Sequence, residues 1–377
     1  MIIAAMHEPN DETRVAISPT SVKQYIKLGL EVVCEHNAGK FSGFSDSDYE
    51  QAGATILKDR KALLKKANIL VCVHQPSSKE LTGLSEHALL ICPIEIDSSS
   101  DLLKWCCRQN ITVFSMNHIP RISRAQNLDI LSSQANLAGY RAVIEAIAYF
   151  NRAVPMMMTA AGMIHPAKVL VLGAGVAGLQ AIATAKRLGA VVYAFDVRAA
   201  AKEQVNSLNA EFIEVGQEQS GETAGGYAKE TSAEYQKLQA ELIDKYARLA
   251  DMVICTALIP GKKAPVLLPK KTVEHMKPGS VIVDLATARG GNCELSVQDK
   301  VVEHGAVTLI GYSNMAGLIP ATASELYSNN VLNLLNLLIT SPLKLNFNPE
   351  DDIIKQAVLC HDGHTLPFQA KKETQHG

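Results

Sequence analysis

The chain has 377 residues, a length that favours two or three domains, each able to bury its own core. Its 36 basic and 38 acidic residues leave a formal charge of −2, which gives no electrostatic reason to expect nucleic acid or a lipid surface as the main partner. The eight cysteines show no CxxC or Cys/His ligand spacing, so they are predicted to be reduced core thiols rather than metal ligands.

The N-terminal stretch meets acidic residues before its apolar run reaches the roughly 7–15 residues of a signal sequence, and it has no basic start. No later run offers the ~18 uninterrupted apolar residues of a membrane span. We therefore expect a cytoplasmic chain that does not itself cross a membrane.

Short β-rich runs alternate with longer helical patterns through the first quarter of the chain. A helix is expected between the first two runs, with Ser18 as its cap, Pro19 in its first turn and Gly29 at its end. Unbroken apolar runs are typical of parallel strands covered on both faces, so they predict a first α/β domain with a parallel sheet. The runs are "IIAAMH", "EVVCEH", "ANILVCV" and "ALLICPI".

A polar cluster follows. The stretch "PRISRAQNLDILSSQANLAGY" places Arg121, Arg124, Gln126 and Asp129 just ahead of a helical pattern that runs from about residue 131 to 150. One interpretation is a helix N-terminus with Asp129 as the capping acid and the arginines in solvent. The other is a site whose Arg, Gln, Asp and Ser side chains hold a polar ligand. The residues alone leave both interpretations open.

A second group of apolar runs predicts a second parallel α/β domain that binds a dinucleotide. Gly173, Gly175 and Gly178 have G-x-G-x-x-G spacing directly after a β-run and at the start of a helix, which suits a tight turn that brings a pyrophosphate to the helix N-terminus. Asp196 ends the next run, where its carboxylate can bind ribose hydroxyls and repel a 2′-phosphate, so NAD(H) is predicted. Arg198 complicates this choice, since an arginine could hold a 2′-phosphate. The runs are "KVLVLGAG", "VVYAFD", "DMVICTAL", "SVIVDLA" and "VTLIGY".

Two further segments organise the rest of the chain. Residues 221–236 are glycine-rich and polar, which predicts an exposed, mobile loop, and a second long helix is expected from about residue 321 to 340. The tail would then return to the first domain. We therefore predict an α/β fold of two Rossmann-like, doubly wound parallel-sheet domains joined by long helices, with the cofactor in the cleft. The expected boundaries are 1–135 plus 335–377 for the first domain and 136–334 for the NAD(H)-binding domain.

A proton donor for carbonyl reduction is not evident in the sequence. No GxSxG, P-loop or metal cluster is present either, and nucleotide binding is the clearest chemistry. The candidates in the first domain, none of them in a diagnostic motif, are His7, Arg14, His74, His87, His118, Glu95 and Asp97.

The order of segments resembles a known family, the NAD(H)-binding component (domain I, or alpha-1 subunit) of proton-translocating nicotinamide nucleotide transhydrogenase. The resemblance covers essentially the whole chain. The Rossmann turn is shared with the related alanine dehydrogenases, whereas "RISRAQ…D…SS" and "GGYAKE" are specific to the transhydrogenases. The segments that carry it are "DETRVAISPTSV", "RISRAQNLDILSSQANLAGYRAV", "VLVLGAGVAGLQAI", "AFDVR", "ETAGGYAKE", "TALIPGKKAP" and "MKPGSVIVDLA…GGNCELS".

The resemblance implies roles for individual residues. It assigns Arg121, Gln126, Asp129 and Ser132 to hold NAD(H) near the position of hydride exchange, and it matches Tyr227 to a mobile-loop tyrosine that closes over the adenosine side. No metal is implied. The cofactor-binding residues expected from the motifs and the resemblance are Ile122, Ser123, Arg124, Gly173, Gly175, Val176, Gly178, Asp196, Val197, Arg198, Gly226, Tyr227, Gln239 and Leu258.

Two departures from related sequences matter. Alanine dehydrogenases carry a lysine in "VKEP" and a histidine after the next strand, whereas this chain has "VHQP" at residues 73–76 and "CPIEID" at residues 92–97. An amino-acid dehydrogenase would therefore lack both catalytic groups. The chain also lacks an arginine that many relatives carry near Leu318, which puts the contacts at the domain junction in doubt.

The leading hypothesis is a separate alpha-1-type subunit that passes hydride from NADH to NADP⁺ on a partner subunit. Direct transfer between two nicotinamides requires alignment rather than an acid or base, so a missing proton donor is expected. The resemblance further implies a homodimer, and membrane partners that carry NADP(H), translocate protons and hold the subunit at the cytoplasmic membrane. The alternatives are an alanine or other amino-acid dehydrogenase with His74 as its acid, and a regulatory NAD(H)-binding module that never exchanges hydride.

Overall fold

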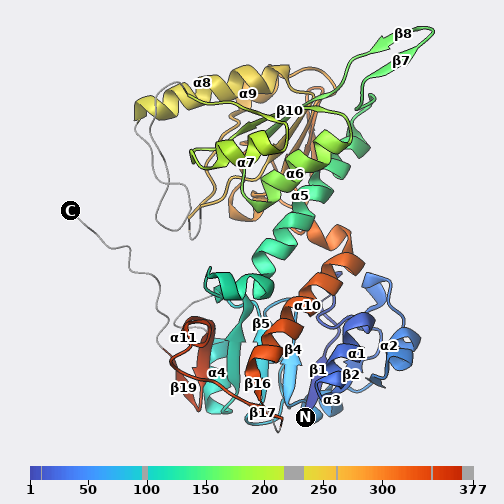
Figure 1. Cartoon of the computed structure of the whole chain (residues 1–377), viewed down its shortest axis with the longest axis vertical. Helices are drawn as coiled ribbons and strands as arrows, with labels where there is room; N and C mark the ends of the chain where they lie inside the picture. Colours follow the sequence, from blue (N-terminus) through green and yellow to red (C-terminus); the bar gives the residue numbers. More distant parts are fainter. Residues whose placement is uncertain (10, 96–100, 216–232, 260–261, 341–342, 367–377) are drawn as a thin grey trace. The chain divides into compact units, whose positions relative to one another are not determined.

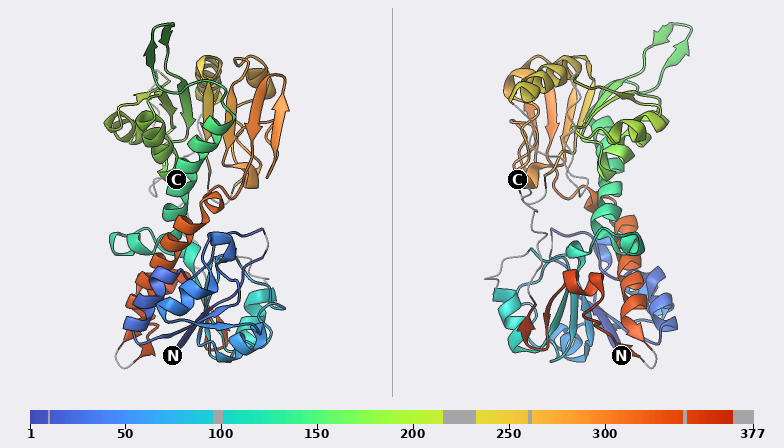
Figure 2. Two further views of the ribbon diagram at one scale, coloured as in Figure 1. Left: turned by 90° about the vertical axis from the view of Figure 1, so that its right-hand side faces the viewer. Right: turned by 60° about the vertical axis from the view of Figure 1, so that its left-hand side comes forward.

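The computed structural model describes residues 1–9, 11–95, 101–215, 233–259, 262–340 and 343–366. The chain divides into two compact units, which we call the first unit (Met1–Gln134 with Ile319–Gly377) and the second unit (Ala135–Leu318). Each unit is built on a mainly parallel sheet covered by helices on both faces (Figures 1 and 2). The predicted fold class, two Rossmann-like α/β domains, is confirmed.

The first unit contains an eight-stranded sheet in the order β19-β18-β6-β5-β4-β1-β2-β3. Strands β1 to β6 are parallel, and β18 and β19 extend the sheet with antiparallel pairings. The chain reverses its direction of travel across the sheet between β1 and β4, which makes their carboxyl ends a topological switch point. The strands are β1 (Ile2–Ala5), β2 (Glu31–Glu35), β3 (Thr55–Leu57), β4 (Ile69–Val71), β5 (Leu89–Cys92), β6 (Thr112–Ser115), β18 (Val358–His361) and β19 (His364–Thr365).

Helices cover this sheet on both faces because each has one apolar side. One face packs against buried residues of α1, α2, α10 and α11, and the other against α3 and α4. The predicted start of α1 is confirmed: Ser18 forms a capping box with Ser21, and Pro19 is the first helical residue. The helices are α1 (Pro19–Lys27), α2 (Asp46–Ala52), α3 (Arg60–Lys66), α4 (Asp101–Arg108), α10 (Pro320–Leu338) and α11 (Asp352–Ala357), with short 3₁₀ helices η1 (Lys40–Ser42), η2 (Met116–His118) and η3 (Ser123–Leu128), and a small ribbon of β16 (Ile339–Thr340) and β17 (Lys344–Leu345).

The second unit contains a seven-stranded sheet in the order β11-β10-β9-β12-β13-β15-β14. All neighbours pair in parallel except the edge strand β14. The switch point lies between β9 and β12, as in dinucleotide-binding sheets. The strands are β9 (Lys168–Leu172), β10 (Val191–Phe195), β11 (Glu211–Phe212), β12 (Met252–Cys255), β13 (Val281–Asp284), β14 (Val301–His304) and β15 (Val307–Ile310).

One face of this second sheet packs against α5, α6 and α7, and the other against α8 and α9. These helices are α5 (Ile130–Tyr149), α6 (Val176–Arg187), α7 (Ala201–Ser207), α8 (Ala233–Leu249) and α9 (Lys270–Glu274), with 3₁₀ helices η4 (Thr287–Arg289) and η5 (Ala316–Leu318). A two-stranded hairpin, β7 (Met157–Thr159) and β8 (Gly162–Ile164), extends from the rest of this unit (Figures 1 and 2).

The unit boundaries fall near one predicted boundary and away from the other. The first lies between residues 134 and 135, against a predicted 135/136, and the second lies at 318/319 rather than 334/335. The difference at the second boundary comes from α10, whose Tyr327, Val331 and Leu334 are buried in the core of the first unit. The apolar pattern of this helix was visible in the sequence, but the core that it joins was not.

The loop predicted for residues 221–236 lies mainly outside the described residues. Its final stretch is described and is helical, since α8 begins at Ala233. The loop prediction was therefore wrong for residues 233–236. Tyr235 is 6% exposed, so burial of an aromatic ring stabilises this end of the helix.

Candidate functional site

The glycine turn lies at the switch point of the second sheet, as the motif predicts. Gly173 follows β9 with φ 95°, a conformation that favours glycine, and Gly175 is the N-cap residue of α6. A Cβ at Gly178 would lie 1.8 Å from the carbonyl oxygen of Gly173, so only glycine lets helix and turn approach this closely. Thr256, just after β12, donates from Oγ1 to the same carbonyl at 2.9 Å. These contacts hold the turn against the neighbouring strand.

Gly175 differs from the other two glycines of the motif. Nothing lies within 4 Å of the position that its Cβ would occupy, and it lies where the first backbone N–H groups of α6 begin. The backbone there is open to a ligand, and the positive end of a helix favours an anion. The cradle therefore fits the pyrophosphate of a dinucleotide.

Asp196 closes the turn on the side of β10. Its carboxylate accepts hydrogen bonds from the backbone N–H groups of Ala174 at 2.7 Å and Arg198 at 2.9 Å. The Arg198 guanidinium adds Nε to Oδ1 at 2.9 Å and Nη2 to Oδ2 at 2.8 Å. The structure thus brings Asp196 to the glycine turn as predicted. A ribose diol that binds this carboxylate must take the place of the Arg198 side chain.

The other predicted cofactor residues of the second unit are more scattered. Val176 opens α6 and is 42% exposed, Val197 follows β10 and is half-buried, and Leu258 follows β12 and is 49% exposed. All three lie at the carboxyl edge of the sheet, where ligands of such sheets bind. Gln239 lies farther along the chain in α8 and is half-buried. Gly226 and Tyr227 lie outside the described residues.

Asn292 supports the cleft and was not predicted from the sequence. Its fully buried side chain accepts from Ala257 N at 3.0 Å and donates to Ala257 O and Pro265 O, each at 2.8 Å. The backbone N–H of Asn292 donates in turn to the buried carboxylate of Asp284. These bonds fix the loop after β12, next to the glycine turn. The signal in the sequence was the "GGNCELS" segment, which by itself indicated only the family.

The predicted hydride-site residues of the first unit lie on η3 and the start of α5. Arg121 and Gln126 are exposed, and Asp129 and Ser132 are half-buried. Asp129 accepts from Ser132 N at 2.9 Å and Ser132 Oγ at 2.6 Å, so it caps α5 as the structural interpretation of this segment expects. Ile122 is half-buried and Ser123 is exposed just before and within η3. Capping fixes Asp129 and Ser132 together and leaves the exposed Gln126 available to a ligand.

Arg124, predicted to bind the cofactor, makes a two-bond ion pair with Asp351. Nη1 donates to Oδ2 at 2.9 Å and Nη2 to Oδ1 at 2.7 Å, and Asp351 is also the N-cap of α11. The Arg124 guanidinium lowers the pKa of the Asp351 carboxyl. The backbone carbonyl of Asn127 accepts from Asn330 Nδ2 at 2.8 Å and Asn333 Nδ2 at 3.2 Å. The segment is therefore held from two sides by residues that follow it by about 200 positions or more in the sequence.

His74, considered as a proton donor, lies at the carboxyl edge of the first sheet between two carboxylates. Its Nδ1 contacts Glu8, which is 3% exposed and also accepts from Val73 N at 2.6 Å. Glu80 lies 4.0 Å from the other ring nitrogen. Burial alone would lower the pKa of His74, but its bond to Glu8 and the surrounding carboxylates outweigh burial and raise the pKa. The positive charge of this ring is balanced within the protein.

Arg14 is engaged in the same way. Nε and Nη2 donate to the two carboxylate oxygens of Glu12 at 2.8 and 2.7 Å, and Nη1 donates to Gln134 Oε1 at 2.8 Å. Both edges of the guanidinium are therefore occupied, and its charge is compensated. A substrate carboxylate would have to displace Glu12 to bind this arginine.

The remaining candidates are dispersed. His7 Nδ1 lies 2.6 Å from Glu8 O, His118 has its pKa lowered by burial, His87 is exposed in a turn and Glu95 is exposed. Asp97 lies outside the described residues. These side chains do not form one site with a shared hydrogen-bond network.

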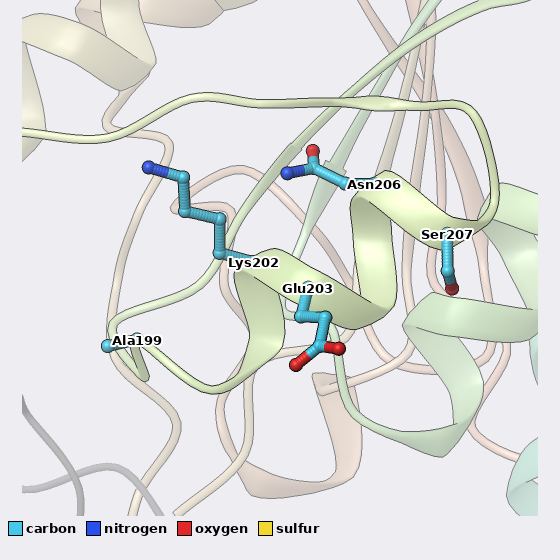
Figure 3. Close-up of a pocket in the computed structure, with 5 residues that line it drawn as sticks. All are labelled: Ala199, Lys202, Glu203, Asn206 and Ser207. Atoms are coloured by element: carbon cyan, nitrogen blue, oxygen red, sulfur yellow. The ribbon is translucent and has the colours of Figure 1, made fainter.

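An open hollow of about 550 Å³ lies against α7 (Figure 3). Lys202 and Glu203 point to different sides of the helix, and Lys202 Nζ pairs with Glu214 at 2.7 Å. Its lining side chains therefore do not converge on a ligand, and the hollow is separate from the glycine turn. The lining residues are Ala199, Lys202, Glu203, Asn206 and Ser207.

Metal-binding clusters and membrane-spanning helices are both absent from the described ranges. No three His, Cys, Asp or Glu side chains within them come together as a metal site would require. Within the same ranges, no helix combines the length and hydrophobicity that a membrane crossing requires.

Comparisons with known proteins agree with this architecture. The chain matches the family models described as alanine dehydrogenase/PNT, N-terminal domain, over residues 5–138 and C-terminal domain over residues 142–367. It is 48% identical over 360 residues to the first portion of the NAD(P) transhydrogenase alpha subunit of Rhodospirillum rubrum, a separate chain, and the match covers 93% of this chain and 94% of that protein. The crystal structure of transhydrogenase from Sinorhizobium meliloti has a TM-score of 0.84 and 42% identity, covering 97% and 99% of the two chains. An L-alanine dehydrogenase structure has a TM-score of 0.79 and 26% identity, covering 97% of each chain.

The paired Rossmann-like units and the glycine turn thus define a member of the alanine dehydrogenase/PNT family, and the chain belongs to it. Its similarity to the alpha subunits of NAD(P) transhydrogenase is much higher than its similarity to the alanine dehydrogenases, which are 27% identical in the Mycolicibacterium smegmatis protein. The resemblance inferred from the sequence motifs is therefore confirmed.

Proposed function

We propose that this chain is the NAD(H)-binding subunit of a proton-translocating transhydrogenase and that it exchanges hydride directly with NADP(H) bound on a partner subunit. The observation that carries the proposal is the glycine turn, whose open Gly175 cradle adjoins the Asp196 carboxylate at the switch point of the second sheet. An acid at this position selects against a 2′-phosphate, so NAD(H) is the nucleotide expected here. The similarity to transhydrogenase alpha subunits supports the reaction type.

The protein contributes position rather than proton transfer in this reaction. NADH supplies the hydride and NADP⁺ accepts it, so the chain must hold one nicotinamide at the right distance and angle and keep water away. In the proposal, Arg121, Gln126, Asp129 and Ser132 surround the nicotinamide end. Asp129 and Ser132 already form one capped unit, and the exposed amide of Gln126 can donate to and accept from a carboxamide or ribose.

An amino-acid dehydrogenase is disfavoured by charge as well as by the missing lysine and histidine. Such an enzyme needs a free cation for the carboxylate of its substrate and a proton donor beside the carbonyl. Arg14 is paired with Glu12, and His74 lies between Glu8 and Glu80. Three carboxylates against two cations give this edge of the first sheet no excess of positive charge to attract an anionic keto acid.

The proposed function is tested by mixing the purified chain and NADH with an NADP⁺-loaded, NADP(H)-binding component of a transhydrogenase. A parallel reaction contains pyruvate and ammonia without that component. We expect NADPH to form only in the first mixture and NADH to be stable in the second. Loss of NADH with pyruvate and ammonia would replace the proposal by an amino-acid dehydrogenase, and NADH binding without either reaction would replace it by a regulatory module.

We further propose that the subunit is a homodimer and that the β7–β8 hairpin contributes to the dimer surface. The hairpin exposes Met157 (40%), Met158 (74%), Met163 (49%) and Ile164 (38%) together, and a patch of this kind is typical of a protein interface. Met158→Asp is expected to weaken the dimer, because it places a charge on this patch. Light scattering coupled to size-exclusion chromatography would measure the mass, with the exposed Leu249→Asp on α8 as the matched control. An unchanged dimer mass in Met158→Asp would remove the hairpin from the interface.

The proposed location follows from the partners. Membrane-spanning and NADP(H)-binding subunits would hold this chain at the cytoplasmic face of the membrane and couple hydride exchange to proton movement. Co-purification from membranes that contain those subunits, and release at high salt or by removal of the partners, would test this aspect of the proposal.

A further inference from the structure

Two cysteines far apart in the sequence meet in the first unit. Cys107 lies in the last turn of α4 and Cys360 in β18, and their sulfur atoms are 2.6 Å apart. A disulfide bond is about 2.05 Å long, so only a small movement would bring the two sulfurs to bonding distance. The same unit contains both residues, and the contact therefore lies within one compact body.

The backbone around the two thiols supports this proximity independently. Helix α4 packs against β18 and lies beside β19 (Figure 1). A Cβ placed on Gly363, in the turn that follows β18, would lie 2.9 Å from Asn110 Oδ1 and 3.5 Å from the carbonyl oxygen of Cys107. The end of α4 and the β18–β19 turn are thus in direct contact on both sides of the cysteine pair.

The pair also differs in exposure from the other thiols. Cys107 is half-buried, whereas Cys34, Cys72, Cys92, Cys106, Cys255, Cys293 and Cys360 are buried. A small reagent can therefore reach Cys107 first, and the buried Cys360 lies next to it to complete the reaction. Burial, and then the neighbouring Cys107 thiol, raise the pKa of Cys360, so this thiol is expected to react only once its partner has been activated.

We propose that Cys107 and Cys360 are a redox-modification site that forms a reversible intramolecular disulfide with a low-molecular-weight disulfide as oxidant. The Cys107 thiolate attacks one sulfur of the oxidant, so that a mixed disulfide forms and one small thiol leaves. Cys360 then loses its proton and attacks the Cys107 sulfur, which releases the second small thiol. Two protein thiols are oxidised to one disulfide and one small disulfide is reduced to two thiols.

The modification would join α4 to the penultimate strand of the first sheet. It connects positions 107 and 360, which flank the whole second unit in the sequence, so the oxidised chain would contain a covalent loop around that unit's residues. The proposal does not depend on hydride exchange, because both cysteines lie outside the predicted nucleotide site.

The test uses the full chain with oxidised glutathione as the probe. After oxidation the remaining thiols are alkylated under denaturing conditions, and the chain is digested with trypsin without reduction. We expect the peptide 105–108 joined to the peptide 356–371, an intact mass lower by two hydrogens, and complete reversal by dithiothreitol. This experiment needs no variant, so a folding defect cannot mask its result.

Variants then identify the sulfurs, since the peptide 105–108 contains both Cys106 and Cys107. Cys107→Ser and Cys360→Ser are each expected to abolish the linked peptide, whereas Cys106→Ser and the buried control Cys34→Ser are expected to retain it. A link that survives in Cys107→Ser, or a wild-type chain that carries glutathione on Cys107 without any internal link, would overturn the proposal.

Discussion

Gly175→Ala is expected to separate nucleotide binding from folding. The backbone of Gly175 has φ −74° and ψ −166°, which alanine adopts without strain, and no atom lies within 4 Å of the new methyl group. Replacing glycine by alanine at a compatible position stabilises proteins by about 0.4–1 kcal/mol, because it restricts the unfolded chain. The melting temperature should therefore stay the same or rise by about 1–4 °C.

Binding should change in the opposite direction. The methyl group would occupy the space through which a pyrophosphate approaches the first N–H groups of α6, and its contacts with the phosphate oxygens would lengthen those hydrogen bonds. We expect the NADH dissociation constant to rise by at least about tenfold, which corresponds to about 1.4 kcal/mol. Titration of NADH fluorescence would give the dissociation constant, and thermal unfolding followed by circular dichroism would give the stability.

Gly178→Ala is the matched contrast at the other end of the motif. Its Cβ would lie 1.8 Å from Gly173 O, so β9 and α6 must move apart. Overpacking of this kind costs about 1–3 kcal/mol, and the variant should melt several degrees lower as well as bind NADH poorly. If Gly175→Ala binds NADH as the wild type does, the pyrophosphate does not lie over this turn, and the assignment of the site to the glycine motif is refuted.

Three further outcomes are expected. Gln126→Asn should leave NADH affinity within about twofold but slow hydride transfer at least about tenfold in stopped-flow assays, because the shorter side chain misplaces a reacting ring; normal rates would remove this residue from the site. Arg124→Ala and Asp351→Ala should each slow transfer by the same factor, about fivefold, and the double variant should be no slower, since they break one positioning contact; additive losses would show that the two act separately. Because the folded-state pKa of His74 is raised, its contribution to stability should be fully present below its unfolded pKa of about 6.5 and be lost as pH rises through the folded value. The stability gap between wild type and His74→Gln, measured by urea unfolding, should thus shrink with increasing pH, and a gap that grows would contradict the Glu8 pairing.

The two sheets could be predicted from the sequence because most of their central strands are buried on both faces. Every apolar run named from the sequence overlaps a strand, and both long helices begin and end within two residues of the predicted positions. The edge strands β3, β11 and β14 escaped prediction, since they are short and partly exposed and carry no unbroken apolar run. The β7–β8 hairpin also escaped, because its methionines are exposed in the monomer and follow no helix or core pattern.

The candidate site was predictable where its chemistry is local. Gly173, Gly175 and Gly178 are close in sequence, and Asp196 ends the adjacent strand, so spacing alone brings them together. Contacts over long separations gave no signal. Arg124 was assigned to the cofactor because its neighbours match a family motif, but its guanidinium pairs with Asp351, 227 residues later. The Cys107 and Cys360 contact was invisible for the same reason, since scattered cysteines show no spacing pattern.

The unit boundaries also set an order of folding during synthesis. The first unit needs α10, β18 and β19 from the end of the chain, whereas the second unit is continuous from residue 135 to 318. At about 5–20 residues per second, a ribosome needs roughly 10–40 s to make that middle stretch. During this interval β1 to β6 wait without α10, whose buried Tyr327, Val331 and Leu334 cover their apolar face in the finished protein. The segment that is translated first is therefore expected to finish folding last, and its uncovered sheet makes the nascent chain a natural client of ribosome-associated chaperones.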